Sequence, residues 1–187
     1  MFFDIKNLEV AERGDYFVDT NVWYWITYVA SKSFLAVRPQ EYQLDHYPSF
    51  IEMALNSGST LYYSPLTLVE LASLIERSEW EIFKQFNSAG NCNLKSFRRD
   101  DAQRRGVIAE LKTAWDAVTG MARPLPYIES GEMASNIMGI LESALLDGYD
   151  AIYVWIMREC GVLNVISDDK DFKGVKGLNL YGCYKPR

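Results

Sequence analysis

Residues 16–26 read YFVDTNVWYWI, and the fold class can be inferred from this segment. Its hydrophobic start ends at an acid, which predicts a short buried strand that terminates at Asp19. Apolar and aromatic residues follow over 22–30, and either Thr20 or Asn21 is able to cap the first turn of a helix there. A buried strand that delivers an acid and passes directly into a helix is the repeating unit of an α/β protein.

The same unit recurs along the chain. The predicted strands are residues 16–19, 60–64, 163–167 and 177–183. Helices are expected at residues 22–30, at 49–58 with Pro48 opening the helix, from Pro65 onward, at 131–146 and at 151–160. Strands that alternate with helices favour a mainly parallel central sheet of four to five strands flanked by helices. The predicted fold class is therefore α/β.

The middle of the chain adds helices to this core. Residues 96–126 mix charged residues with a helical apolar pattern, which predicts one long helix with a break at Gly106. We expect this helical elaboration, at about 85–130, to belong to the same domain as the rest of the chain, because 187 residues is a usual size for one domain.

Composition excludes several classes of function. The net charge of −6 argues against a broad cationic surface that grips nucleic acid non-specifically. The three cysteines lack C-x-x-C spacing and the only histidine is His46, so a disulfide framework, a zinc site and histidine-based catalysis are not predicted. The N-terminus carries acids where a signal peptide is basic, and no run of about 18 apolar residues occurs, so we expect a cytoplasmic protein without membrane contact.

Acids stand where ligands bind in such a sheet, outside the carboxyl ends of the strands. Asp19 and Asp169 follow predicted strands, Glu70 lies on the first turns of a helix after a strand, and Asp150 opens a helix. Four carboxylates in one crevice repel one another unless a cation or protons neutralise them. Because oxygen ligands select hard cations, the sequence predicts a Mg²⁺ or Mn²⁺ site that activates water without histidine.

Single positions leave alternatives open. Asp19 suits a helix cap as well as a polar pocket, and a first-turn glutamate is favoured by the helix dipole in any case. Asp150 is preferred to Asp147, and Asp169 to Asp168, whose side chain should point away if the strand extends into the turn. The joint pattern is much harder to explain by chance than any one of its members.

Two further groups of residues suit an interface. The one dense basic cluster is able to receive an RNA backbone, although a solvated helix face is the simpler explanation; it comprises Arg98, Arg99, Arg104 and Arg105. The early helices carry more apolar residues than a small sheet is expected to cover, which predicts a partner or dimer surface. These residues are Trp23, Tyr24, Ile26, Phe50, Ile51, Leu74 and Ile75.

Four segments, in order, resemble the acidic motifs of the PIN-domain nucleases, especially the VapC-type ribonuclease toxins of toxin–antitoxin pairs. They are FVDTNVWYWI, SPLTLVELASLI, DAIYVWIMRECGV and LNVISDDKDFKGVKGLNLY. The resemblance implies that the four acids are Asp19, Glu70, Asp150 and Asp169, that Asp171 is an additional acid at the metal, and that Thr20, Asn21 and Ser167 order the site by hydrogen bonds.

The resemblance further implies a PIN-like fold and an endoribonuclease that uses Mg²⁺ or Mn²⁺. It implies the toxin of a type II pair, with RNA as substrate and a small antitoxin as partner. The apolar residues of the early helices also predict a homodimer. The alternative is a PIN-fold regulatory or scaffold protein with little or no nuclease activity, a weaker hypothesis because all four acids are present. Aspartyl-phosphate phosphatases need a second aspartate where this chain has Asn21, and an unrelated binding module has little in its favour.

Overall fold

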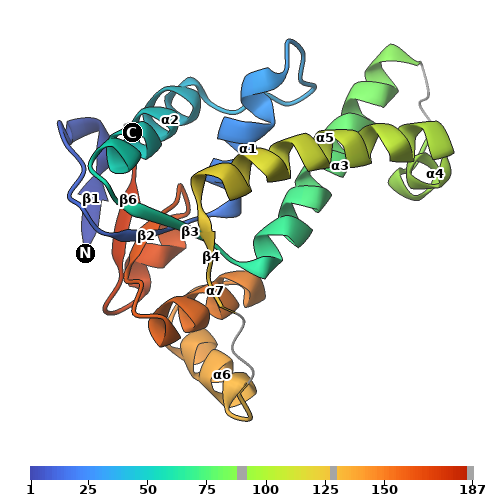
Figure 1. Ribbon diagram of the computed structural model, residues 1–187. Helices are drawn as coiled ribbons and strands as arrows, with labels where there is room; N and C mark the ends of the chain where they lie inside the picture. The colour runs from blue at the N-terminus through green and yellow to red at the C-terminus, as the bar shows by residue number, and fades with distance from the viewer. Residues whose placement is uncertain (88–91, 127–129, 185–187) are drawn as a thin grey trace.

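The computed structural model describes residues 1–87, 92–126 and 130–184, and in these residues a six-stranded, wholly parallel sheet forms the centre. The strand order is β1-β6-β5-β2-β3-β4, and Figure 1 shows the strands side by side. The strands are β1 (Phe2–Asp4), β2 (Asp15–Val18), β3 (Thr60–Tyr63), β4 (Arg123–Pro124), β5 (Asn164–Ile166) and β6 (Asn179–Gly182). The predicted α/β class with a parallel sheet is confirmed.

Helices cover both faces of the sheet. They are α1 (Thr20–Thr27), α2 (Glu41–Asn56), α3 (Pro65–Phe86), α4 (Leu94–Arg99), α5 (Asp101–Met121), α6 (Met133–Ser143) and α7 (Gly148–Glu159), with 3₁₀ turns η1 (Ile5–Asn7), η2 (Val29–Ser31) and η3 (Lys170–Gly174). Alternate residues of β2 point to opposite faces: Val18 packs with α1, α2, α3 and α5, and Phe17 packs with α6 and α7. The sheet is therefore buried on both sides, as all-parallel sheets are.

The predicted number of strands was too low. The four expected strands are β2, β3, β5 and β6, and the structure adds β1 beside β6 and β4 beside β3. Both additions lie at the edges and are two or three residues long, too short to display a period of two. β4 contains Pro124, which edge strands tolerate because one side of an edge strand makes no ladder hydrogen bonds.

The predicted start of α2 was wrong. This helix begins at Glu41 and carries Pro48 in its interior instead of at its start. Gln40 and Gln43 form a reciprocal capping box that satisfies the backbone at the true start. The predicted end was right, since Gly58 follows the helix with a left-handed φ of 76°.

The helix break in the middle of the chain lies at Asp100, not at Gly106. The Asp100 carboxylate accepts hydrogen bonds from the backbone N–H groups of Ala102 and Gln103, at 2.9 and 3.0 Å, and so caps α5. Gly106 lies within α5, where nothing approaches the position of a Cβ atom. A strong N-cap therefore decides the boundary over a glycine that an exposed helix interior tolerates.

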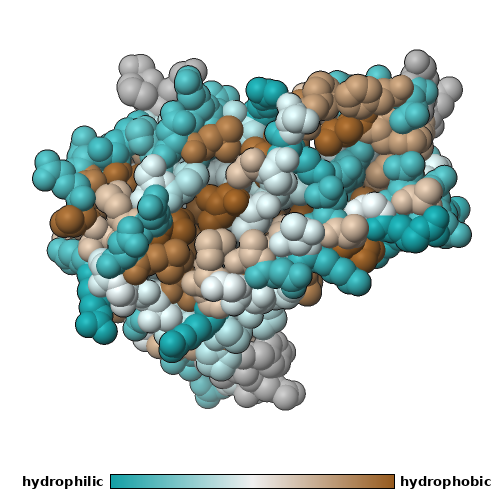
Figure 2. Space-filling model, turned by 45° about the horizontal axis from the view of Figure 1, so that its top comes forward, coloured by the Kyte–Doolittle hydropathy of each residue, from teal (hydrophilic) through white to brown (hydrophobic). Residues whose placement is uncertain are grey.

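The apolar residues expected to be left over at the surface are mostly core. Trp23, Phe50 and Ile75 are fully buried, and Tyr24 and Ile51 are nearly so. The reason is α5, whose buried face packs into the same cluster as α1 and α3. Figure 2 shows apolar side chains in several separate groups among hydrophilic ones on the face in view.

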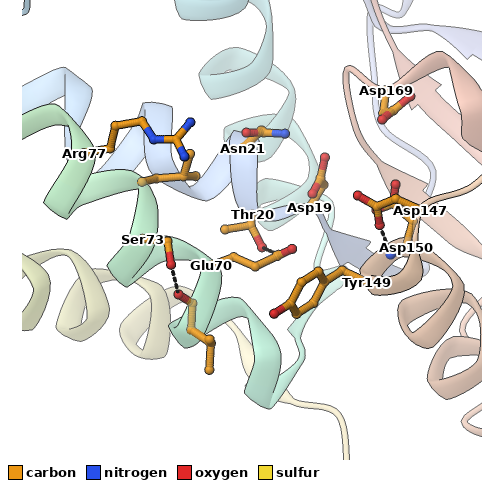
Figure 3. A pocket seen from close by; sticks show the side chains of 12 residues that line it. Asp19, Thr20, Asn21, Glu70, Ser73, Arg77, Asp147, Tyr149, Asp150 and Asp169 are labelled. Atoms are coloured by element: carbon orange, nitrogen blue, oxygen red, sulfur yellow. Dashed lines mark hydrogen bonds between the residues drawn. The ribbon is translucent and has the colours of Figure 1, made fainter. Parts of the chain in front are cut away.

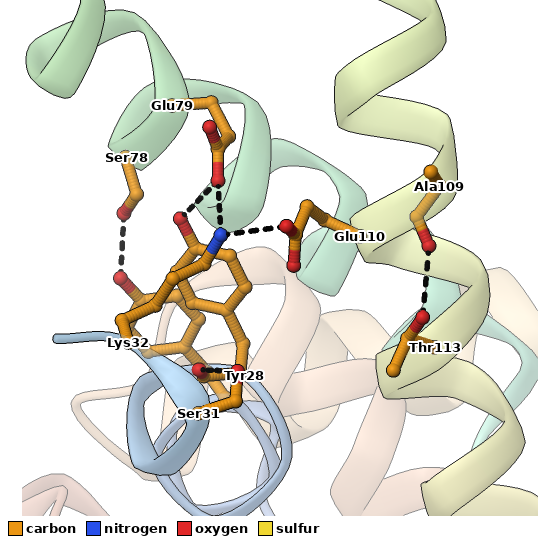
Figure 4. Close-up of polar contacts among 9 residues, drawn as sticks. Tyr28, Ser31, Lys32, Ser78, Glu79, Ala109, Glu110 and Thr113 are labelled. Atoms are coloured by element: carbon orange, nitrogen blue, oxygen red, sulfur yellow. Dashed lines mark hydrogen bonds and ion pairs between the residues drawn. The ribbon is translucent and has the colours of Figure 1, made fainter.

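A partly buried polar cluster ties these helices together (Figure 4). The Lys32 ammonium lies 2.7 Å from Glu79 of α3 and 2.8 Å from Glu110 of α5. The Tyr28 hydroxyl donates to the same Glu79 carboxylate at 2.8 Å. The middle helices are thus attached to the core by charge as well as by apolar packing. Within the described ranges, no helix combines the length and the apolar character needed to cross a membrane.

Candidate metal centre

The predicted acids line one pocket at the carboxyl edge of the sheet. The pocket has a volume of about 290 Å³ and is lined by Asp19, Thr20, Asn21, Val69, Glu70, Ser73, Leu74, Arg77, Asp147, Tyr149, Asp150 and Asp169. In Figure 3, Asp19, Asp150 and Asp169 face a common space, and Glu70 approaches from α3 on the other side. The chain thus brings together side chains from β2, α3, α7 and the turn after β5.

Asp19 is the most deeply buried of these acids, with 5% of its surface exposed. Its backbone N–H donates to the Ile166 carbonyl at 3.0 Å, which fixes the end of β2 against β5. It occupies the N-cap position of α1, yet its carboxylate makes no capping hydrogen bond. The Ser167 hydroxyl instead donates to Asp19 Oδ2 at 2.7 Å. Asp19 is therefore held facing the pocket and is not used as a cap.

Ser167 links two of the acids. Its fully buried hydroxyl donates to Asp19 and accepts the backbone N–H of Asp169 at 2.9 Å. One side chain therefore sets the spacing between the end of β2 and the turn after β5.

Glu70 is held by two hydroxyl groups. The Thr20 hydroxyl donates to Glu70 Oε2 at 2.6 Å, and the Tyr153 hydroxyl donates to the same oxygen. Tyr153 is 1% exposed, and burial raises its pKa, so the phenol stays protonated and remains a donor. Tyr153 was not recognised in the sequence, because its contact with Glu70 joins residues 83 positions apart.

Asp147 and Asp150 have different roles at the start of α7. Asp147 is the N-cap, and its carboxylate accepts the backbone N–H of Asp150 at 2.9 Å (Figure 3). Burial, together with the charges of four neighbouring acids, raises the pKa of Asp150 to about 8; these acids are Asp19, Asp147, Asp169 and Glu70. The geometry therefore favours Asp150 over Asp147 as the residue available to a cation.

The pocket is electrostatically suited to a hard cation. Burial raises the pKa of Asp19 to about 6, an effect that the Ser167 hydrogen bond opposes and the charge of Glu70 reinforces. Among the described residues, no three carboxylate, thiol or imidazole groups are close enough to enclose a metal ion by themselves. The donors that face the pocket are oxygens, the donor set that fits Mg²⁺, an ion that keeps several waters and needs few protein ligands.

Asp150→Asn should stabilise the metal-free protein and reduce the stabilisation that Mg²⁺ gives. The raised pKa means that ionised Asp150 destabilises the fold, an effect that is absent below its ordinary pKa of 3.8, grows as pH rises from there to about 8, and is complete above that pH. Discounted for partial solvent access, the gain in the metal-free variant is about 1–2 kcal/mol at pH 8.5, or roughly 2–8 °C in Tm. Thermal unfolding in EDTA should show this gain at pH 8.5 and none at pH 4, and Mg²⁺ should stabilise the wild type more than the variant. A variant less stable than the wild type in EDTA at pH 8.5 would contradict this picture.

The remaining sequence-predicted residues lie outside the pocket. Asp171 is exposed and does not line it; its backbone N–H donates to Asp169 Oδ1 at 2.8 Å, so its contribution is to the turn. The Asp168 carboxylate turns away from the pocket, as expected, and accepts hydrogen bonds from Tyr42, Gln43 and Tyr47.

The basic cluster of α4 and α5 is partly neutralised. Arg98 donates to both oxygens of the buried Glu76 carboxylate, and Arg104 lies 3.5 Å from it. Hydrogen bonding and charge from Arg98 lower the pKa of Glu76. Arg99 and Arg105 are exposed. Two of the four arginines thus already have a protein partner.

Arg77 was missed by the sequence interpretation although a signal exists. It is the one cationic side chain among the lining residues given above for the pocket. With Ser73 and Leu74 it follows Glu70 at helical spacings of three, four and seven, the positions that share one face of α3.

Comparison with known proteins finds similarity in structure but not in sequence. No family model matches the chain, and no curated protein matches it significantly. VapBC2 from Rickettsia felis, solved bound to a DNA fragment from their promoter, aligns with 12% identity and a TM-score of 0.54, covering 90% of this chain and 98% of that one. FitAcB from Neisseria gonorrhoeae aligns with 14% identity and a TM-score of 0.49, covering 89% and 96% of the two chains. PAE2754 from Pyrobaculum aerophilum aligns with 15% identity and a TM-score of 0.43, covering 90% of this chain and 91% of that one.

The similarity to VapBC2 extends over nearly all of both chains and establishes a shared fold. The α/β, PIN-like fold expected from the four acidic motifs is therefore confirmed.

Proposed function

We propose that this protein is a Mg²⁺- or Mn²⁺-dependent endoribonuclease. The observation that carries the proposal is the convergence of Asp19, Glu70, Asp150 and Asp169 on one pocket at the carboxyl edge of a PIN-like sheet. These acids come from four separate elements, and two of them have pKa values raised toward neutrality by burial and mutual repulsion. Perturbed carboxylates that gather in a cleft are typical of functional sites.

The residues divide into metal ligands and groups that position them. Asp19, Asp150 and Asp169 would hold the ion together with water molecules, because these carboxylates do not enclose it by themselves, and the ion would supply Lewis acidity toward the phosphodiester and acidify a water molecule. Ser167 keeps Asp19 and Asp169 in register through its two hydrogen bonds. Thr20 and Tyr153 hold one oxygen of Glu70, so the other oxygen is available to orient a water molecule or complete the shell of the ion. Arg77, on the same face of α3, is placed to neutralise a substrate phosphate.

The direct test is cleavage of a varied pool of structured and single-stranded RNA by the purified protein. We expect phosphodiester cleavage with Mg²⁺ or Mn²⁺, none with EDTA, and none of DNA of matched sequence. If a folded, metal-loaded preparation leaves the whole RNA pool intact, the alternative of a PIN-fold regulatory or scaffold protein is favoured.

We propose further that the protein acts as a toxin controlled by a small antitoxin. The likeness to VapBC2 supports this, as does a second hollow of about 350 Å³ between α1 and α3 that shares Leu74 and Arg77 with the acidic pocket. Its remaining lining includes Leu35, Val37 and Pro39, a surface suited to an apolar segment of a partner. An arginine of that partner would compete with the metal for the carboxylates by charge. The predicted homodimer is testable by the mass of the purified protein in solution.

A further inference from the structure

A larger hollow adjoins the acidic pocket on the side of β6. Its volume is about 640 Å³, and it is lined by Asn21, Trp25, Tyr42, Gln43, Asp168, Asp169, Lys170, Asp171 and Tyr184. Asn21 and Asp169 line both spaces, so the two are continuous. A molecule in this hollow would lie beside Asp169, at the border of the acidic pocket.

Asp168 makes one wall of the hollow rigid. Its carboxylate accepts hydrogen bonds from Tyr42 at 3.0 Å and Gln43 at 2.6 Å on one oxygen, and from Tyr47 at 2.9 Å on the other. These donors all belong to α2, whereas Asp168 follows β5. Tyr47 in turn contacts Trp25, with ring centres 5.2 Å apart. Asp168, which does not line the acidic pocket, therefore holds the aromatic wall of the adjoining hollow in place.

Lys170 lines this hollow, and two further lysines lie beside its aromatic residues, Lys6 also donating a hydrogen bond to the Tyr184 carbonyl at 2.6 Å. Lys170 lies 4.8 Å and Lys173 4.3 Å from the centre of the Tyr184 ring, and Lys6 lies 5.7 Å from that of Tyr42. Phe2 stacks on Tyr184 with ring centres 5.3 Å apart. None of these three lysines forms an ion pair with a residue in the described part of the chain. Three acids, Asp168, Asp169 and Asp171, line the same hollow, so its positive charge is confined to the side of Tyr184, where Lys170 and Lys173 lie.

We propose that this hollow binds a nucleotide next to the scissile phosphate of single-stranded RNA. The inference rests on the proposed ribonuclease function and adds where the substrate strand lies. Aromatic rings beside cations are the combination that single strands require, because bases stack on the rings and phosphates pair with the lysines. A base must leave a duplex to enter such a hollow, so unpaired loops and single strands are the preferred substrates. The arginines of α4 and α5 are a poorer platform, since Arg98 and Arg104 are already paired with Glu76.

Binding of a labelled single-stranded oligoribonucleotide in EDTA tests the proposal apart from catalysis. Tyr184→Leu should weaken binding by about tenfold, the effect of losing one stacked base, and Tyr184→Phe should retain it because the ring remains. Lys170→Ala should weaken binding several-fold and reduce the slope of log K against log salt by about 0.7, whereas Lys170→Arg should not. Arg105→Ala removes the same charge from the α5 cluster and should change little. Circular dichroism checks that each variant is folded.

The outcomes separate this inference from the function on which it rests. If the wild type cleaves RNA but Tyr184→Leu and Lys170→Ala bind single strands as it does, the hollow is not the nucleotide site and the ribonuclease assignment stands. If Arg105→Ala weakens binding of the oligoribonucleotide more than Lys170→Ala does, the RNA lies on α5 and the proposal is overturned. If the wild type neither binds nor cleaves any RNA, the proposed function itself fails.

Discussion

Asp19→Asn is expected to reduce Mg²⁺-dependent RNA cleavage by about 10²–10³-fold or more, while the protein stays folded. The substitution removes a ligand charge but preserves shape, and an asparagine oxygen can still accept the 2.7 Å hydrogen bond from Ser167. Because Asp19 is 5% exposed, removal of its charge should also relieve the burial penalty in the metal-free protein. Initial cleavage rates in saturating Mg²⁺ measure the effect, with Tm as the check on folding.

Asp171→Asn is the matched control. Asp171 belongs to the same acidic turn as Asp169 but is exposed and lies outside the pocket, so its loss should leave most of the activity. Expression of the wild type should slow growth, and the Asp19→Asn form should not. Near wild-type cleavage by folded Asp19→Asn would remove this residue from the metal site.

Gly182→Ala is expected to have the largest effect on stability of the substitutions considered. A Cβ atom at Gly182 would lie 2.5 Å from the backbone oxygen of Ser167, closer than real Cβ atoms approach. Backbone atoms of adjacent strands cannot rotate away, so the strands must separate locally. We expect a loss of about 1–3 kcal/mol, or roughly 2–12 °C in Tm.

The same substitution should lower activity, because Ser167 carries the hydrogen bonds that place Asp19 and Asp169. A shift of the ligands by a fraction of an ångström is sufficient to slow catalysis. Gly106→Ala provides the control, since nothing lies within 4 Å of its Cβ position inside α5, and alanine there should be neutral or stabilising by about 0.5–1 kcal/mol. Equal stability of the two variants would mean that β6 and the turn after β5 are not closely packed.

The parts of the fold that could be predicted are those with a local cause. Buried runs followed by an acid identify β2 and β5, the first leading into a helix and the second into a turn, and Asp19 and Asp169 follow from the geometry of parallel sheets. The edge strands β1 and β4 could not be predicted, because two or three residues carry no period and their pairing partners lie far away in sequence.

The start of α2 depends on several residues together and not on Pro48 alone. Pro48 suggested a helix start, but the capping box at Gln40 and the anchoring of Tyr47 to Asp168 favour a longer helix. The apolar residues of α1 suggested a free surface because no local pattern reveals that α5 folds back over them.

The groups that position the acids were the least predictable part of the site. The contact of Tyr153 with Glu70 and the three hydrogen bonds on Asp168 depend on the tertiary fold alone. Sequence spacing shows which acids stand at strand ends, but not which hydroxyl groups turn them toward the pocket.

A crystal structure of the wild-type protein with Mn²⁺, located by its anomalous scattering, would show directly whether these carboxylates bind the metal. We expect an anomalous peak in the pocket between Asp19, Asp150 and Asp169, with oxygen ligands about 2.0–2.3 Å from the ion. The peak should be lost in Asp19→Asn. A peak at another site, or an empty pocket at a Mn²⁺ concentration that supports full RNA cleavage, would contradict the claim that these carboxylates hold the metal.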